Sequence, residues 1–140
     1  MHAKITSLTP DLAVASQIVA TDIPEIAAAG YRTLINNRPD GEESVQLSSE
    51  EAKKQAEALG LAYRYLPVTA STLTIAEIDA FRDMLAGPDK PILAHCRSGT
   101  RCYLLWAAVQ VRDGKSSADA LIRQAADRGF DISGLSKFAS

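Results

Sequence analysis

The 140-residue chain has little of what binds metals or cross-links secreted proteins, because it holds only two cysteines and two histidines. Two cysteines cannot build a disulfide framework, and neither stands in a CxxC or a Cys/His metal spacing. The histidines, His2 and His95, give little support to a metal-dependent mechanism. We therefore expect no metal and no cofactor, and we expect a reducing cytoplasm in which both thiols are free to react.

A basic excess and long apolar runs are also lacking. The chain has 15 Lys and Arg against 17 Asp and Glu, for a net charge of -2, which argues against a general nucleic-acid binder. Its longest apolar stretches fall far short of the roughly 18 residues that suggest a membrane span, and residues 1–10 lack the apolar core of a secretory signal. With no linker or repeat in view, we expect one domain over residues 1–140, with neither nucleic acid nor membrane as a partner.

Short β-like runs alternate along the chain with segments that carry helix start and stop signals. The β-like runs cover residues 12–16, 31–36, 61–68 and 91–96. The helical segments cover residues 21–30, 48–60, 74–87, 100–111 and 116–129, and the apolar side chains of the tail after them are expected to pack back onto the core. Capping boxes at Ser48 and Thr74 mark two of the helix starts. This order predicts an α/β fold with a mostly parallel central sheet flanked by helices.

Three loops, 37–43, 67–73 and 95–101, are expected to meet at the carboxyl ends of these strands. In the last loop Cys96 follows a buried strand and a helix begins near Thr100. Gly99 permits a tight turn, and the free NH groups of the helix start form a cradle for an anion. Arg101 can close the cradle with a planar fork of donors.

A thiol at the floor of such a cradle favours its thiolate form, and its pKa can fall to roughly 3.5–7.5. The loop therefore predicts that Cys96 is a reactive nucleophile beside an oxyanion site. The competing interpretation is a small buried cysteine that only packs. Because the strand, the Ser-Gly turn, the arginine and the helix start all agree, we favour the nucleophile.

The heptapeptide HCRSGTR (95–101) resembles the nucleophile loop of cysteine-based phosphatases, His-Cys-x5-Arg-Ser/Thr, and the rhodanese loop, Cys-Arg-x-Gly-x-Arg. TLINNRPDGEE (33–43) and LAYRYLPV (61–68) resemble the stretches before the catalytic loop in dual-specificity phosphatase-like proteins. Together they are similar to the phosphatase-like domain of beta-lactamase-hydrolase-like proteins. Some members of that group are described as sulfur transferases and some as phosphatases. The resemblance covers about residues 5 to 135 and implies a cysteine-phosphatase-like α/β fold.

The loop and the resemblance together assign the site. The residues predicted to be catalytic are Cys96 and Arg101. The residues predicted to bind the anion are Arg97, Ser98, Gly99, Thr100 and Arg101. The candidate auxiliary residues are His95, Cys102, Arg38 and Asp40. Each auxiliary residue has a plain structural alternative. His95 would be a hydrogen-bonded structural histidine. Cys102 could resolve a Cys96 persulfide or form a disulfide with Cys96, but we favour the alternative that it fills a small space under the helix. Arg38 could face the cradle or pair with Asp40, Glu42 or Glu43.

Three departures from the phosphatase pattern bear on the reaction. The spacing is Cys-x4-Arg, one residue shorter than in phosphatases and as in rhodaneses. Cys102 stands where phosphatases usually place Ser or Thr, and a thiol is a poor substitute for a hydroxyl donor. The loop expected to carry the general acid, PVTASTLT (67–74), has no Asp or Glu. Asp40, Glu42 and Glu43 on the neighbouring loop could substitute for it, but we favour a solvated turn for these acids.

A missing acid harms phosphate-ester cleavage more than sulfur transfer, because sulfite or a low-pKa thiol leaves without protonation. We therefore expect a sulfurtransferase that carries a persulfide on Cys96 and acts on a small anionic sulfur donor, with a separate persulfide-processing protein as a candidate partner. The alternative is a cysteine-dependent phosphatase that forms a Cys96 phosphoenzyme from phosphate monoesters. An alternative of another class is a non-catalytic binder of phosphorylated or sulfonated partners.

Overall fold

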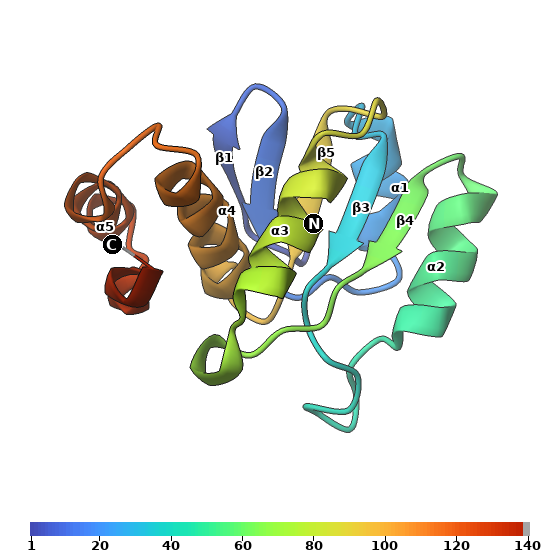
Figure 1. Ribbon diagram of the computed structural model, residues 1–140. Helices are drawn as coiled ribbons and strands as arrows, with labels where there is room; N and C mark the ends of the chain where they lie inside the picture. Colours follow the sequence, from blue (N-terminus) through green and yellow to red (C-terminus); the bar gives the residue numbers. More distant parts are fainter. Residues whose placement is uncertain (139–140) are drawn as a thin grey trace.

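The computed structural model describes residues 1–138 and shows an α/β fold in which one five-stranded sheet is flanked by helices (Figure 1). The strands are β1 (Ile5–Thr9), β2 (Leu12–Ala15), β3 (Thr33–Asn36), β4 (Ala62–Tyr65) and β5 (Ile92–His95). The helices are α1 (Asp22–Ala28), α2 (Ser49–Ala58), α3 (Ile75–Leu85), α4 (Thr100–Arg112) and α5 (Ala118–Asp127). Two short 3-10 turns are η1 (Ala70–Thr72) and η2 (Ser133–Phe138).

The sheet places β5 at its centre, in the order β1-β2-β5-β3-β4. Strands β2, β5, β3 and β4 are parallel, and β1 pairs with β2 in the antiparallel direction. His95, the last residue of β5, lies opposite Ala15 of β2 and Asn36 of β3. The residue after His95 therefore emerges between two neighbouring strands, at the edge of the sheet where parallel strands end.

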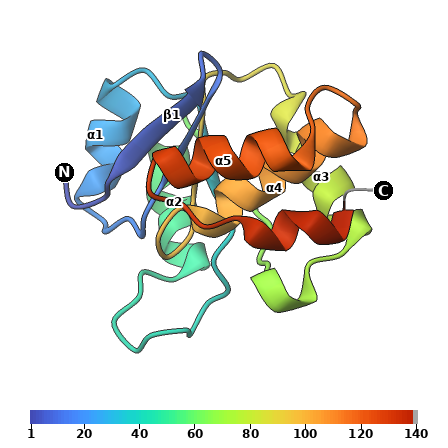
Figure 2. The same cartoon turned by 90° about the vertical axis from the view of Figure 1, so that its left-hand side faces the viewer.

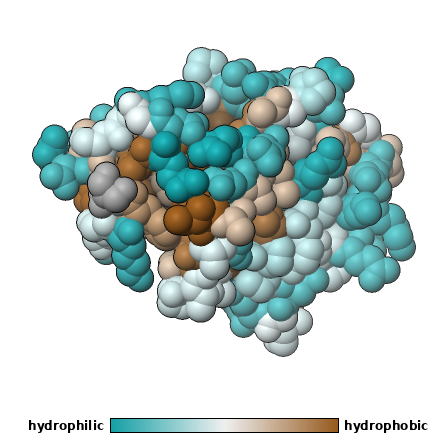
Figure 3. Space-filling model, in the orientation of Figure 1, coloured by the Kyte–Doolittle hydropathy of each residue, from teal (hydrophilic) through white to brown (hydrophobic). Residues whose placement is uncertain are grey.

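Alternation along the strands divides the core between the two faces of the sheet. One face carries Leu12, Val14, Ile35, Ile92 and Ala94, which share a cluster with buried residues of α3, α4 and α5. The other face carries Ala13, Ala15, Leu34 and Leu93, which share a cluster with buried residues of α1 and α2. In the view of Figure 3, hydrophobic residues gather at the centre of the face over α3 and α4 and are ringed by hydrophilic ones.

Helix α4 is apolar on most of its faces because it is enclosed on several sides. It contacts α3, α5 and η2, as well as β2 of the sheet, and seven of its residues are buried. Figure 2 shows α5 lying outside α4, on the side away from the sheet. The tail expected to pack back onto the core does so, with Ile132 and Leu135 buried and Phe130 and Phe138 packed partly exposed against them.

The expected fold class is confirmed, and each predicted helix is present. The strand β1 was not expected, because its residues are only partly buried at the sheet edge and its sequence, ITSLT, carries no strong alternation. None of the helices in residues 1–138 has both the length and the apolar character that a membrane crossing requires. The single domain over residues 1–140 stays a prediction.

Candidate active site

The turn that follows β5 surrounds the sulfur of Cys96 with backbone. Cys96 is completely buried, and its own NH donates to the Ala15 carbonyl at 3.2 Å. Gly99 has φ +93°, which turns its NH back toward the cysteine, and this NH lies 3.1 Å from Sγ. A Cβ at Gly99 would lie only 3.3 Å from the Phe130 ring and 3.5 Å from the Ala15 backbone, so the turn also needs glycine for space.

The two cysteines ionise in opposite directions. The side-chain hydrogen bond from Cys102 lowers the pKa of Cys96 to about 6, against an opposing effect of burial, with further help from the backbone NH groups of Cys102, Gly99 and Arg101. Burial raises the pKa of Cys102 well above its usual value, and the neighbouring Cys96 raises it further. Cys102 is therefore a protonated thiol that donates to the Cys96 thiolate. A thiol that resists ionisation is a poor resolving nucleophile.

Arg101 is held by the loop that follows β3. Its two terminal nitrogens donate to the two oxygens of Glu42 at 2.9 and 2.8 Å, and one of them also donates to the Val68 carbonyl at 3.1 Å. The hydrogen bonds from Arg101 lower the pKa of Glu42 to about 2, with a smaller contribution from Arg38. These contacts join the three loops expected to meet at this edge of the sheet, and Figure 1 shows them at the same end as the start of α4.

Arg38 lies behind this pair and is only 2% exposed. Its guanidinium donates to Glu42 at 2.9 Å, to Glu43 at 3.0 Å and to the Gln17 side chain at 3.2 Å. Of the two alternatives for Arg38, the salt bridge to neighbouring acids is the one observed. The acids lie on an exposed turn, as expected, and Glu42 and Glu43 are in addition bound by arginines.

The other auxiliary residues lie differently. Burial lowers the pKa of His95 to about 4, so the imidazole next to Cys96 is neutral. Both ring nitrogens are buried, and the neutral ring supplies no positive charge to the Cys96 thiolate, so an auxiliary role for His95 stays a prediction. Asp40 accepts from the Ser49 NH at 2.8 Å, and its own NH donates to the Tyr65 hydroxyl at 2.9 Å. Asp40 therefore braces the start of α2, away from the cradle.

The rim of the turn is exposed where a ligand would enter. Arg97 is 69% exposed and lies 3.5 Å from Glu43. The Ser98 hydroxyl donates to the Thr100 hydroxyl at 2.9 Å, which ties the two rim side chains to each other. The anion-binding role of these residues stays a prediction. In the part of the chain that the structure describes, no cluster of three or more His, Cys, Asp or Glu side chains could hold a metal ion.

Two cavities flank this turn. One of about 230 Å³ lies between η1 and η2 and is lined by Thr100 and Arg101 of the turn, with Leu104 and Ile132 as apolar wall and Lys137 at its side. The other, of about 420 Å³, is lined by Arg97 and Arg38 together with residues 17–19 and 45–47. Either cavity offers room for the part of a substrate that lies beyond the anion.

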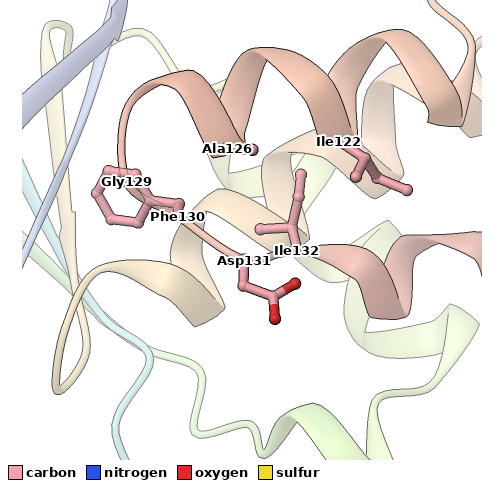
Figure 4. A pocket seen from close by; sticks show the side chains of 6 residues that line it. All are labelled: Ile122, Ala126, Gly129, Phe130, Asp131 and Ile132. Atoms are coloured by element: carbon pink, nitrogen blue, oxygen red, sulfur yellow. The ribbon is translucent and has the colours of Figure 1, made fainter.

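A third cavity, of about 260 Å³, lies between α5 and residues 129–132 (Figure 4). Its wall is made largely by Ile122, Phe130 and Ile132, and Asp131 is its one titratable lining residue among those described. In Figure 4 the Asp131 carboxylate points away from Ile122 and Ala126. None of its lining residues belongs to the 95–101 turn, so this cavity is not the candidate active site.

Sequence reasoning missed the bonds from Arg101 to Glu42 and to the Val68 carbonyl, and the contact of Arg38 with Gln17. The run RPDGEE offered a signal, because three acids beside an arginine at the end of a strand can face a neighbouring loop as well as solvent. The Val68 carbonyl and Gln17 offered none, since a backbone acceptor and an amide on a distant turn leave no pattern.

A buried cysteine on a strand-turn-helix loop, with an arginine at the start of the helix, is the arrangement expected of cysteine-based phosphatase-like proteins, and comparison with known proteins agrees with it. Residues 4–113 match the family described as "Beta-lactamase hydrolase-like protein, phosphatase-like domain", and the chain belongs to this family. It is 36% identical over 129 residues to a beta-lactamase hydrolase-like protein of Xylella fastidiosa (strain Temecula1), a match that covers 92% of this chain and 30% of the relative. The chain thus spans about a third of the length of the curated relatives it matches.

Solved structures agree with this family. A candidate phosphatase from Neisseria meningitidis Z2491 is 32% identical, with a TM-score of 0.84 and coverage of 94% of both chains. TpbA of P. aeruginosa, solved as a cysteine-to-serine variant in complex with pTyr, is 17% identical with a TM-score of 0.66, and the match covers 94% of this chain and 86% of TpbA. The second likeness shows the fold alone. The expectation of an enzyme with a phosphatase-like fold is confirmed by the family and by the Neisseria structure, while the catalytic role of Cys96 stays a prediction.

Proposed function

We propose that the chain is a cysteine-dependent phosphatase that hydrolyses phosphate monoesters through a phosphoenzyme on Cys96. The observation that carries the proposal is the Cys96 sulfur, which is buried beneath a turn of NH groups and has a pKa of about 6. At neutral pH this thiolate is the main form of Cys96, ready to attack a phosphorus atom held by the surrounding donors. The family and its phosphatase-named structural neighbour support the same reaction.

The reaction has two steps. In the first, the Cys96 thiolate forms an S–P bond while the bond from phosphorus to the ester oxygen breaks, and the leaving group departs with the electron pair. In the second, water attacks the same phosphorus, the S–P bond breaks, and inorganic phosphate and the thiolate are released. The Cys102 thiol, which donates to the Cys96 sulfur, stabilises the thiolate as it leaves in this second step.

The proposal is tested by phosphate release from an aryl phosphate, measured beside transfer of sulfur from thiosulfate to cyanide. We expect phosphate release in the native protein and none in Cys96→Ser, with sulfur transfer far slower. Phosphate release that survives in Cys96→Ser would contradict a cysteine mechanism. Sulfur transfer that is fast, lost in Cys96→Ser and without matching phosphate release would reverse the assignment.

Sulfur transfer stays the second candidate because the Cys-x4-Arg spacing and the lack of a carboxyl in residues 67–74 both favour it. In that reaction the Cys96 thiolate attacks the outer sulfur of a donor such as thiosulfate, a persulfide forms on Cys96, and sulfite leaves. A separate persulfide-processing partner would then accept the sulfur.

The remaining candidate is a domain that binds phosphorylated or sulfonated partners without catalysis. Such a domain would show slow alkylation of Cys96 near neutral pH. In each case the group bound in the cradle is an anion. The cytoplasmic location stays a prediction.

A further inference from the structure

The buried Arg38 is the starting point, because all of its guanidinium nitrogens are engaged within the protein. They donate to Glu42, Glu43 and Gln17, and the Arg38 NH donates to the Asn36 side chain at 2.8 Å. An arginine that is 2% exposed and bonded at every nitrogen has one fixed position. Yet Arg38 itself forms no hydrogen bond with the cradle around Cys96 within residues 1–138.

Glu42 connects this fixed arginine to Arg101. One oxygen of Glu42 accepts from both Arg38, at 2.9 Å, and Arg101, at 2.8 Å, and the other oxygen accepts from Arg101 at 2.9 Å. We propose that Arg38 is a positioning residue that acts through Glu42 on Arg101, and that Glu42 stays in place when an anion binds.

The alternative is that Glu42 merely occupies the arginine fork and gives way to the substrate. Burial of Arg38 argues against this alternative. If Glu42 swung out, Arg38 would lose the partner of its Nε while remaining out of contact with water, and leaving a buried charge short of a partner is strongly unfavourable. Arg101 would at the same time lose the contact that fixes the plane of its guanidinium.

A fixed Glu42 limits what Arg101 can offer a ligand. Both terminal nitrogens of Arg101 are held by Glu42 and Val68, whereas its Nε has no protein partner in residues 1–138. The anion therefore binds to Arg101 Nε and to the NH groups of the 97–101 turn. Such binding depends on the orientation of the guanidinium, which Arg38 and Glu42 together set.

The test follows alkylation of Cys96 by iodoacetamide with and without inorganic phosphate, so that phosphate binding is measured as protection. The variants are Arg38→Met, Arg38→Lys, Glu42→Gln and the double variant Arg38→Met/Glu42→Gln. The matched control is Arg112→Met. Arg112 lies on α4, the helix of Arg101, and it is also paired with a carboxylate, that of Asp79. Thermal unfolding shows whether each variant folds.

We expect the alkylation rate without phosphate to stay close to native, while each variant needs more phosphate for the same protection. Arg38→Lys should fail like Arg38→Met, because an ammonium cannot hold both carboxylates in one plane. The double variant should lose no more than the single ones, because the two residues act as a unit. Arg112→Met should behave as native.

Catalysis adds a second readout, which rests on the proposed function. Misplacing Arg101 should lower kcat/KM for an aryl phosphate by up to about 10²-fold, chiefly through kcat. The proposal would be overturned if phosphate protected Cys96 better in Glu42→Gln than in the native protein. It would also be overturned if the losses of phosphate protection added in the double variant, or if a folded Arg38→Lys were protected as well as the native protein. A native protein that phosphate protects but that hydrolyses no ester would refute the proposed function while leaving the protection test intact.

Discussion

At the scale of single residues, the two buried thiols have different protonation states. Cys96 ionises because donors surround it, and Cys102 stays protonated because it is buried beside a negative partner. The residue after the arginine in phosphatases is usually a hydroxyl donor, and here a thiol takes its place. The departure from the phosphatase pattern is thus smaller than the sequence suggested.

The role of Cys102 is tested by removing its donor and then restoring one. Cys102→Ala should raise the pKa of Cys96 from about 6 to roughly 7 or above, because a hydrogen bond to a charged group is lost. Cys102→Ser should keep the pKa low, since a hydroxyl donates at least as well. The pH dependence of alkylation at Cys96, followed by mass spectrometry, measures both. An unchanged pKa in Cys102→Ala would leave this thiol with a packing role alone.

Glu42 gives a prediction about stability in acid. Its pKa is lowered from 4.5 to about 2 in the folded chain, so its ion pairs contribute stability that is fully present above pH 4.5. That contribution is lost as the pH falls toward 2 and the carboxylate takes up a proton. The difference in Tm between the native protein and Glu42→Gln should therefore shrink over this interval. A difference that is constant across it would show that the ion pairs add nothing to stability.

At the scale of elements, the strand-turn-helix unit β5-α4 depends on the backbone of Gly99. Gly99→Ala should destabilise the fold by about 1–2 kcal/mol for its positive φ, and further because the new Cβ meets Phe130 and Ala15. Gly30→Ala is the matched control, since Gly30 has φ +100° but open space around it. Urea unfolding should show the larger loss for Gly99→Ala, and slower alkylation of Cys96 should accompany it. Equal losses would mean that the close approach is unimportant.

The elements themselves were largely readable from the sequence. The N-cap at Ser48, the capping box at Thr74 and the apolar run after Thr100 are local signals, and helices begin there as expected. The edge strand β1 was missed because its residues are only partly buried. Long-range partners were missed for a different reason. The bond from Arg101 to Glu42 spans 59 residues, and no local pattern specifies which acid an arginine will reach across a folded sheet.

At the scale of the whole molecule, the acids around the cradle determine which substrates suit it. Glu42 is held as an anion with a pKa of about 2, Glu43 is bound by Arg38 and Arg97, and Asp40 is bound to the start of α2. None of these three carboxyls is arranged to protonate a leaving group. Asp131, which lines the cavity beside Thr100 and Arg101, accepts a hydrogen bond from the Ser133 NH that lowers its pKa below the usual value, so it too is ionised near neutral pH. Substrates should therefore be those whose leaving group departs readily as an anion.

This charge arrangement predicts a strong dependence on the leaving group. Aryl phosphates should be hydrolysed faster than alkyl phosphates by about 10²–10⁴-fold, the usual contribution of a general acid. The value of kcat/KM should rise as the pH passes about 6, where Cys96 ionises. It should show no later fall of the kind that a general acid causes when it loses its proton. Steady-state kinetics over a series of esters measures both. Similar rates for aryl and alkyl esters would reveal a proton donor.

The ionisation of Cys96 is the central claim, and its direct measurement is the rate of iodoacetamide alkylation at this residue as a function of pH. Cys102 is buried and protonated and should react slowly. Mass spectrometry of the cleaved chain shows which of the two thiols carries the label. We expect a midpoint near pH 6. A midpoint near 9, the ordinary value for a cysteine thiol, would contradict it.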